Sequence, residues 1–371
     1  MAKCVLMLAR GGPLDGSQRQ MYYLARGLDR ARYEPVMVLD REGAFADVLR
    51  QDGIQTHVVA IWPWRGFPGA LLRYFDGYGL VKLARRVGAD LVHASDVWRS
   101  GYMHFLSRRL GVPSVQHIRG PLGARSIRKH EVGASSAVIP IAARYVADLV
   151  AAGVAPERIR GIDDAVDLAA FRPEARGWEE VRRRFDPAGG HVLVGLVGRI
   201  EQRKRVMEFL EMVAPLARRG SGVKFLVIGQ SSREDYRQAV MEATERLGLS
   251  EHVVFTGRWE DMPAMMAAVD VVVTMSGGSV MFEAQACGKA LLSVRTDGRH
   301  SVHTRDGETA LCVTTSEPGP ATEALGRLVE DGELRGRLGR VGRAWVEEHL
   351  SPAVLAERTQ AVYDELVKGR Q

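Results

Sequence analysis

The sequence predicts an α/β protein with two successive domains, each built on a parallel β-sheet with helices on both faces. Short, nearly continuous apolar runs alternate with helix-like segments along the first half of the chain, and the alternation starts again in the second half. Apolar runs of this kind are typical of strands buried on both faces of a parallel sheet. A chain of 371 residues is also long for one domain and comfortable for two.

The individual elements follow this alternation. In the first half, the strand-like runs are Lys3–Ala9, Tyr33–Asp40, Thr56–Ile61, Leu91–Ala94, Ser114–Ile118 and Ala137–Ile141. Helix-like segments between them include Ser17–Leu28, Ala44–Asp52 and Tyr145–Ala152. In the second half, the runs are Val192–Val197, Val223–Ile228, His252–Thr256, Val269–Thr274, Ala290–Val294 and Ala310–Val313. They alternate with helix-like segments at Val206–Arg218, Asp235–Gly248 and Phe282–Cys287. Two such arrays predict two doubly wound domains.

The predicted domain boundary lies near Asp163–Pro173, where the first array ends and a charge-rich stretch begins. We therefore expect a first domain over residues 1–165 and a second over residues 166–350. The final segment, Pro352–Val367, has apolar residues at helical spacing, so residues 351–371 are expected to form a C-terminal helix.

Composition and charge bound the class of protein. Residues 1–165 carry 23 Lys and Arg against 15 Asp and Glu, whereas residues 166–371 carry 28 against 30. A basic half attracts anionic partners such as lipid head groups, phosphorylated acceptors or nucleic acid. No recognised nucleic-acid-binding module is visible, so we expect no nucleic-acid partner. The three cysteines fit no metal spacing and indicate reduced thiols. No secretion signal or long apolar run is visible, and we expect a cytoplasmic protein, with at most peripheral contact at the inner face of the membrane.

The heptapeptide Gly198–Lys204, with the sequence GRIEQRK, directly follows a strand-like run. It places Arg199 and Lys204 beyond the carboxyl end of that strand, at the edge where open α/β sheets bind ligands. A planar guanidinium and a mobile ammonium together suit a diphosphate. The alternative is two ordinary surface cations at the start of a helix.

Further motifs follow in a set order. They are the Gly-rich loop Arg10–Ser17, the segment Ile159–Asp167 with Phe171–Pro173, then Gly257–Trp259, Phe282–Ala290 and Asp306–Leu311. In this order and spacing the chain resembles the GT-B glycosyltransferases, specifically the large retaining family 4 or group 1 transferases. The resemblance covers essentially the whole chain and is most specific across residues 192–313. It implies two Rossmann-like domains that face each other across a cleft, with a C-terminal helix that returns to the first domain.

The resemblance also implies roles for residues of the second domain. Arg199 and Lys204 match the pair that holds the donor's diphosphate. Glu283 matches an acid that accepts hydrogen bonds from the ribose hydroxyls; the alternative is an acid that only favours its helix N-terminus. Arg258 lies in the loop that typically reads the nucleobase.

Other expected donor contacts involve glycines and one histidine. Gly277 and Gly278 are expected to offer backbone N–H donors next to Ser279. Gly16 matches the glycine of the first loop that lies against donor or acceptor. His117 matches a histidine that faces the reacting sugar, where an imidazole can bond a hydroxyl or the leaving phosphate. A lone histidine at a strand end can equally be structural.

Three departures from the family pattern bear on the site. Met275 stands where the family has the first of its paired glutamates, an acid that normally contacts the transferred sugar. Asp164 and Ala165 replace the usual Asn-Gly of the domain junction. Arg205 replaces the glycine that follows the lysine.

The acceptor is expected on the basic first domain. Trp62–Phe67, which leads into Leu71–Arg86, combines aromatic residues and cations, as suits a membrane surface that carries a lipid-linked acceptor. The alternative is a core-packed amphipathic helix with a solvated face. Arg119 and Arg125 are expected to bind an anion on the acceptor side.

These observations together predict a retaining glycosyltransferase that moves a sugar from a nucleotide-diphosphate sugar to a lipid-linked, glycan or small-molecule acceptor. We expect no metal and no cofactor, because Arg199 and Lys204 take the place of a divalent ion and no acidic D-x-D cluster stands in the expected position. One alternative is a sugar-nucleotide 2-epimerase of the same fold, which Met275 disfavours because proton abstraction needs acids. The other is a catalytically degenerate transferase that serves as a binding scaffold.

Overall fold

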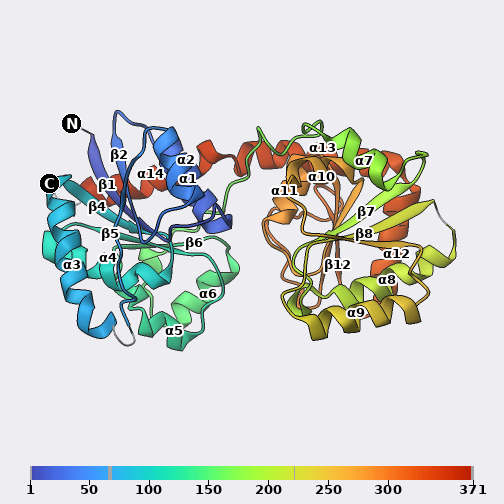
Figure 1. Cartoon of the computed structure of the whole chain (residues 1–371), viewed down its shortest axis with the longest axis horizontal. Coiled ribbons are helices and arrows are strands. Elements are labelled where there is room, and N and C mark those ends of the chain that lie inside the picture. The colour runs from blue at the N-terminus through green and yellow to red at the C-terminus, as the bar shows by residue number, and fades with distance from the viewer. Residues whose placement is uncertain (1, 66–68, 221, 369–371) are drawn as a thin grey trace. The chain divides into compact units, whose positions relative to one another are not determined.

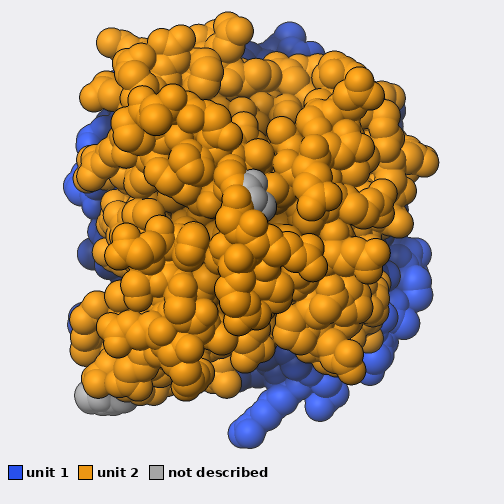
Figure 2. Space-filling view, turned by 90° about the vertical axis from the view of Figure 1, so that its right-hand side faces the viewer, with its two compact units in different colours: residues 1–165, 352–371 blue, residues 166–351 orange. Residues whose placement is uncertain are grey.

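A computed structural model describes residues 2–65, 69–220 and 222–368 of the chain. The chain divides into two compact units, residues 1–165 with 352–371 and residues 166–351 (Figure 2). Gly66 and Phe67 of the aromatic segment lie outside the described residues. No helix within the described ranges is long and apolar enough to cross a membrane.

Unit 1 is a doubly wound parallel sheet with the strand order β3-β2-β1-β4-β5-β6. Its strands are β1 (Lys3–Ala9), β2 (Tyr33–Leu39), β3 (Gln55–Val58), β4 (Ala89–Ala94), β5 (Ser114–Ile118) and β6 (Ala137–Pro140). Its α-helices are α1 (Gly16–Gly27), α2 (Ala44–Gln51), α3 (Gly69–Arg86), α4 (Ser100–Leu110), α5 (Ala124–Lys129), α6 (Arg144–Ala151) and α14 (Pro352–Lys368). The 3₁₀ turns are η1 (Val97–Arg99), η2 (Val132–Ala134) and η3 (Pro156–Arg158).

Unit 2 repeats the architecture with the strand order β12-β11-β10-β7-β8-β9. Its strands are β7 (Val192–Val197), β8 (Val223–Ile228), β9 (Val253–Gly257), β10 (Val271–Thr274), β11 (Ala290–Arg295) and β12 (Leu311–Thr314). Its helices are α7 (Trp178–Phe185), α8 (Val206–Arg218), α9 (Glu234–Arg246), α10 (Met262–Ala268), α11 (Val280–Ala286), α12 (Pro318–Glu330) and α13 (Gly332–His349), with a 3₁₀ turn η4 (Gln202–Lys204). The predicted fold, two Rossmann-like domains, is confirmed.

The predicted third strand was too long. Thr56–Ile61 was expected, but β3 begins at Gln55 and ends at Val58. β3 is the edge of its sheet and pairs with β2, which ends at Leu39. The amide of Val59 still donates to the carbonyl of Leu39, and beyond that bond the partner strand has no further residues to pair with.

The C-terminal helix α14 packs into unit 1, although it follows unit 2 in the sequence (Figure 1). Leu355, Val362 and Tyr363 are buried in the same apolar cluster as Met21 and Leu24 of α1. This cluster covers one face of the sheet of unit 1. Burial of that apolar face, at roughly 1.5–3 kcal/mol per large side chain, fixes the helix in place.

Candidate functional site

Unit 2 brings two Gly-containing loops together at one sheet edge. Strand β7 lies between β10 and β8, and the sheet grows from β7 in opposite directions, so the segments after β7 and β10 leave the same edge side by side. Ligands bind at such a switch point in open α/β sheets. The segment after β7 contains Gly198–Lys204 and the segment after β10 contains Gly277 and Gly278, so the fold brings the two predicted donor segments together.

Lys204 lies between these two loops. A Cβ at Gly198 would stand 3.2 Å from the Cε atom of Lys204, and the Nζ atom is 4.0 Å from the position of a Cβ at Gly278. Gly198 has a φ of +145°, which only glycine adopts easily. Burial lowers the pKa of Lys204, and the nearby cation of Arg203 lowers it further. The ammonium group is therefore poised for an anion between the two loops.

Arg199 does not converge on this point in the structure. Its side chain is 64% exposed and its guanidinium lies 3.6 Å from a carboxylate oxygen of Glu201. Arg203 shares the same carboxylate at 2.8 Å. An exposed pair of this kind is weak, so Arg199 can exchange Glu201 for a stronger anion at little cost.

Arg205 stands where the family pattern has a glycine after the lysine. It adopts left-handed backbone angles, with a φ of +57°, and ends the turn η4 directly before α8. Its Nε atom donates to Glu208 at 3.1 Å. A non-glycine residue in this conformation costs about 1–2 kcal/mol, and a glycine at this position would avoid that cost.

The loop after β10 differs from the sequence expectation in one respect. The N–H of Gly277 donates to Thr274 Oγ1 at 2.9 Å, so it is not free for a phosphate or sugar oxygen. Gly278, with a φ of +114°, and Ser279, the residue before α11, complete the loop. Gly278 therefore replaces Gly277 as the backbone donor to consider next to Lys204.

Met275, which stands in place of the first glutamate of the family pattern, is buried. Its side chain is only 5% exposed and belongs to the apolar cluster around Val273 and Leu292. Glu283 lies half-buried in the first turns of α11. The sugar side of the site therefore lacks one carboxylate of the family pattern, and apolar packing fills its place.

Arg295 is a residue that the sequence reasoning missed. It ends β11, and its Nη1 atom lies 3.5 Å from the position of a Cβ at Gly277. Only 15% of its side chain is exposed, and Asp297 holds the guanidinium through bonds of 3.1 and 3.2 Å. A cation at the end of the strand next to β10 was the available signal.

The remaining predicted donor residues are less constrained. Arg258 is exposed just beyond β9, two strands away from β7. Trp259 next to it is half-buried, and its ring packs 5.7 Å from the ring of Phe185 against an apolar cluster, which favours a half-buried anchor over a contact with the nucleobase. Gly16 is exposed at the start of α1, and no atom stands within 4 Å of the position of its missing Cβ.

In unit 1, Arg119 is engaged inside the protein. Its guanidinium forms an ion pair with Asp164 and donates to the carbonyl of Ser95 at 3.1 Å. Burial raises the pKa of Asp164, and the charge of Arg119 opposes that rise. The expectation that Arg119 waits for an anion does not fit this pairing, because a buried carboxylate needs its cation. Arg125 is exposed on α5.

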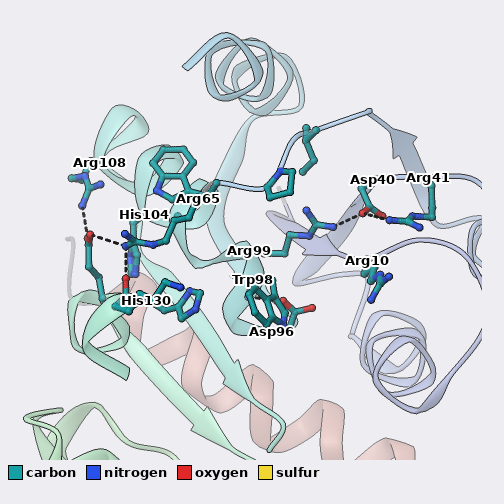
Figure 3. Close-up of a pocket in the computed structure, with 16 residues that line it drawn as sticks. Arg10, Asp40, Arg41, Arg65, Asp96, Trp98, Arg99, His104, Arg108 and His130 are labelled. Carbon is teal, nitrogen blue, oxygen red and sulfur yellow. Dashed lines mark hydrogen bonds and ion pairs between the residues drawn. The ribbon is translucent and has the colours of Figure 1, made fainter. Parts of the chain in front are cut away.

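Unit 1 contains a basic pocket of about 490 Å³, at the carboxyl ends of β1, β2 and β4 (Figure 3). The cations that line it are Arg10, Arg41, Arg65, Arg99, Arg108 and Lys129, against the acids Asp40, Asp96 and Glu131. Most of these residues were missed, although several stand directly after strand-like runs. The cations outnumber the acids, so the pocket suits an anionic ligand.

Two sides of the pocket are built differently. On one side Asp40 is partly buried, which by itself raises its pKa, but the Gly11 amide, Arg41 and Arg99 outweigh burial and lower the pKa. This carboxylate stays ionised and is paired with Arg41 and Arg99, so its role is structural. On the other side Glu131, in a left-handed conformation with a φ of +52°, lies 3.7 Å from Arg65 and 3.8 Å from Arg108. These longer, exposed pairs are weak, so they cost little to exchange for a ligand. Arg65 also donates to the backbone carbonyl of Lys129, so Arg108 is the less constrained of the two arginines.

Trp98 adds an aromatic surface to the pocket. Its side chain is 71% exposed, and its ring lies 5.4 Å from the ring of His130. Burial, together with the charges of Arg65 and Lys129, lowers the pKa of His130. An exposed tryptophan beside cations can stack on a sugar or polyol ring while the cations bind its anionic group.

Comparisons with known proteins decide the family. The family described as Glycosyl transferases group 1 matches residues 191–331, and Glycosyltransferase Family 4 matches residues 14–170. The D-inositol 3-phosphate glycosyltransferase of Nocardia farcinica is 31% identical over 312 residues, which are 74% of this chain and 67% of that protein. The chain belongs to the group 1, family 4 glycosyltransferases. The resemblance expected from the motifs is thereby confirmed.

Other relatives of this family 4 glycosyltransferase agree. The D-inositol 3-phosphate glycosyltransferase of Salinispora tropica is 30% identical over 311 residues, and the aligned part spans 74% of this chain but only 64% of that relative. The 2-deoxystreptamine glucosyltransferase of Streptomyces kanamyceticus is 29% identical over 248 residues, which are 59% of this chain and 62% of that protein.

Solved structures confirm the GT-B fold of this glycosyltransferase. Anabaena Alr3699/HepE in complex with UDP and glucose superposes with a TM-score of 0.81 at 20% identity, covering 98% of this chain and 99% of that one. A glycosyltransferase from Rickettsia africae gives a TM-score of 0.83 at 14% identity and covers 99% of each chain. At these identities the likeness concerns the fold.

Proposed function

We propose that this chain is a retaining glycosyltransferase that moves a sugar from a nucleoside-diphosphate sugar to an anionic polyol or carbohydrate. The observation that carries the proposal is Lys204, held half-buried between the loops at Gly198 and Gly278 on the switch-point edge of unit 2. A solved structure of similar fold has UDP-glucose bound, and relatives act by name on an inositol phosphate or on 2-deoxystreptamine.

In this proposal the leaving group is a nucleoside diphosphate. The bond from the anomeric carbon to the β-phosphate oxygen breaks while the acceptor hydroxyl bonds the same face of that carbon, and the hydroxyl proton passes to the departing diphosphate. The transition state is oxocarbenium-like, and negative charge grows on the diphosphate as the bond breaks. Lys204 and a rotated Arg199 neutralise that charge, which is worth most where water is excluded. Neither group needs a metal ion, so we expect transfer to continue in the presence of a chelator.

The acceptor part of the proposal rests on the pocket of unit 1. Arg65, Arg108 and Lys129 supply cations for a phosphate or similar anion, and Trp98 supplies a face for the ring that carries the attacking hydroxyl. This arrangement favours a phosphorylated polyol over a neutral natural product.

The localisation part of the proposal concerns α3. Phe75, Tyr78, Lys82 and Arg85 recur at helical spacing and are all exposed, Phe75 to 78%. Cations and aromatic residues on one helix face support peripheral contact with an anionic membrane. Sedimentation with vesicles that contain phosphatidylserine tests this part; equal binding by the wild type and Phe75→Ser would contradict it.

The catalytic proposal is tested by offering UDP-glucose and D-inositol 3-phosphate to the full chain. We expect a glucosylated product by mass spectrometry, with the anomeric configuration of the donor in its proton NMR spectrum. Trp98→Ala should raise the KM for the acceptor about tenfold, roughly the effect of one lost aromatic contact, and leave the KM for the donor unchanged. Failure of a panel of nucleoside diphosphates to raise the melting temperature, with no transfer, would refute the proposal.

A further inference from the structure

A chain of hydrogen bonds runs through the core of unit 1 from the C-terminal helix to His117. The hydroxyl of Tyr363 on α14 lies 2.5 Å from Nδ1 of His93 on β4, and Nε2 of His93 lies 2.7 Å from Nδ1 of His117 on β5. All three side chains are fully buried. Burial of polar groups this deep in a core costs free energy unless they are hydrogen-bonded, so it matters which atom donates and which accepts in each bond.

The geometry of the chain is well defined by its surroundings. The two imidazole rings are stacked, with centroids 4.7 Å apart and an interplanar angle of 14°. The ring of Tyr363 meets His93 edge-on at 5.7 Å. Tyr363 belongs to the apolar cluster that also contains Leu91 and Val115. Apolar packing therefore holds the three rings in register.

Burial fixes the protonation of these groups. It lowers the pKa of His93 to about 3 and the pKa of His117 well below its usual range, and the charge of Arg119 acts in the same direction on both. Burial raises the pKa of Tyr363 well above its usual range. Near neutral pH each group thus carries one proton.

Counting these protons gives the direction in which the hydrogen bonds between Tyr363, His93 and His117 are donated. In the described part of the protein, the hydroxyl of Tyr363 has His93 Nδ1 as its hydrogen-bond partner. If Tyr363 donates to Nδ1, a neutral His93 must carry its proton on Nε2 and donate it to His117 Nδ1. His117 then carries its own proton on Nε2. The reverse direction would leave two buried atoms without partners among the described residues, the tyrosine hydroxyl as a donor and His117 Nε2 as a bare acceptor. The forward direction leaves only one, the Nε2–H of His117.

The unpaired Nε2 atom of His117 indicates a place for a ligand oxygen. Nε2 of His117 is buried and has no hydrogen-bond partner among the described residues. A buried donor left unpaired costs about 1–3 kcal/mol, so a retained one suits an oxygen supplied from outside. His117 is the penultimate residue of β5, close to the strand edge where ligands bind in this fold.

We propose that Tyr363 is a positioning residue that, through His93, holds His117 in its Nε2–H tautomer as a neutral donor for an oxygen of the bound sugar. This role for His117 rests on the proposed transferase function. It makes His117 a hydrogen-bond donor and excludes it as a general base. Because protein atoms cover Nε2, the sugar must displace a neighbouring side chain to reach it. The proposal also gives α14 a function, since its docking determines which proton His117 presents.

The test is long-range ¹H–¹⁵N NMR of the full chain with ¹⁵N-labelled histidine, which distinguishes protonated from bare ring nitrogens. We expect His117 of the wild type to be protonated on Nε2. In Tyr363→Phe the two directions of the chain become about equal, because each leaves one atom of His93 unpaired, so the Nε2–H form should fall about twofold. Addition of UDP-glucose should shift the Nε2–H resonance of His117.

Tyr33→Phe is the matched control. Tyr33 packs 5.4 Å from Tyr363, but its hydroxyl bonds Asp364 at 2.6 Å and does not touch the histidines. Its removal should leave the tautomer unchanged, and melting curves show whether each variant is folded. A wild-type His117 protonated on Nδ1, or a spectrum unaltered by Tyr363→Phe, overturns the proposal. Both tautomer readings are made without substrate, so they stand apart from any failure of the transferase assay.

Discussion

Replacement of Lys204 by glutamine tests the electrostatic basis of the donor site most directly. The substitution keeps most of the side-chain length and removes the charge. The ammonium lies between the loops at Gly198 and Gly278, and its pKa is lowered because burial has already removed part of its hydration. Folding has therefore already met part of the free-energy cost of removing water from the ammonium group, and a diphosphate that binds there does not have to meet that part again.

The size of the effect follows from the exposure of the two cations. A hydrogen bond to a charged group contributes about 1.5–3 kcal/mol, so Lys204→Gln should weaken UDP binding about 10- to 150-fold. Arg199 is 64% exposed and paired with Glu201. An exposed ion pair contributes about 0–1 kcal/mol, so Arg199→Gln should weaken UDP binding less than about fivefold.

Isothermal titration with UDP measures both variants, and Arg203→Gln is the matched control. Arg203 belongs to the same turn and carries the same charge, but it is 68% exposed and faces Glu201. Its loss should change the affinity less than about twofold. If Lys204→Gln binds UDP as the wild type does, or if Arg203→Gln loses as much affinity, the assignment of the diphosphate to Lys204 is wrong.

Three further predictions concern the neighbours of this site and the core of unit 1. Gly198→Ala should also lower UDP affinity, by titration, because the added Cβ would stand 3.2 Å from Lys204 Cε at a φ of +145°; unchanged affinity would show that the lysine needs no such cradle. Met275→Glu should not restore a sugar contact. It should lower the melting temperature by about 10 °C, since an unpaired buried charge costs about 3–5 kcal/mol, whereas the control Met275→Leu should melt near the wild type. An active, stable glutamate variant would contradict the burial of this position. His93 has a folded-state pKa of about 3 against 6.5 in the unfolded chain, so the unfolded state binds the proton first as the pH drops. The contribution of His93 to the free energy of unfolding is therefore fully present above pH 6.5 and should fall as the pH drops from 6.5 towards 3. Urea titrations at several pH values measure this dependence, which His93→Gln should reduce, and an equal dependence in both proteins would refute the reasoning.

Local pattern was sufficient to predict the two sheets and the two Gly-containing segments that meet at one edge of the sheet of unit 2. Strands buried on both faces appear in the sequence as short apolar runs, and the residue after such a run stands at the edge where ligands bind. Gly198 and Lys204 could be placed for that reason. The same reasoning placed β3 wrongly at its end, because the end of an edge strand depends on the length of its partner.

Contacts between distant segments were beyond the reach of that reasoning. Arg119 is paired with Asp164, and Met275 is buried in the core. Whether a polar side chain is free for a ligand depends on which segments fold against it, and no local pattern records that.

The sequence by itself determined the family, the succession of strands along the chain and the residues that follow most of those strands, since these depend on neighbours in the chain. Only the tertiary structure decided the basic pocket of unit 1 and the chain from Tyr363 to His117. Both join residues from several elements, and the latter joins residues 246 positions apart. Their chemistry comes from burial and distance, which exist only after the elements of unit 1, α14 included for the second of the two, have packed against its sheet.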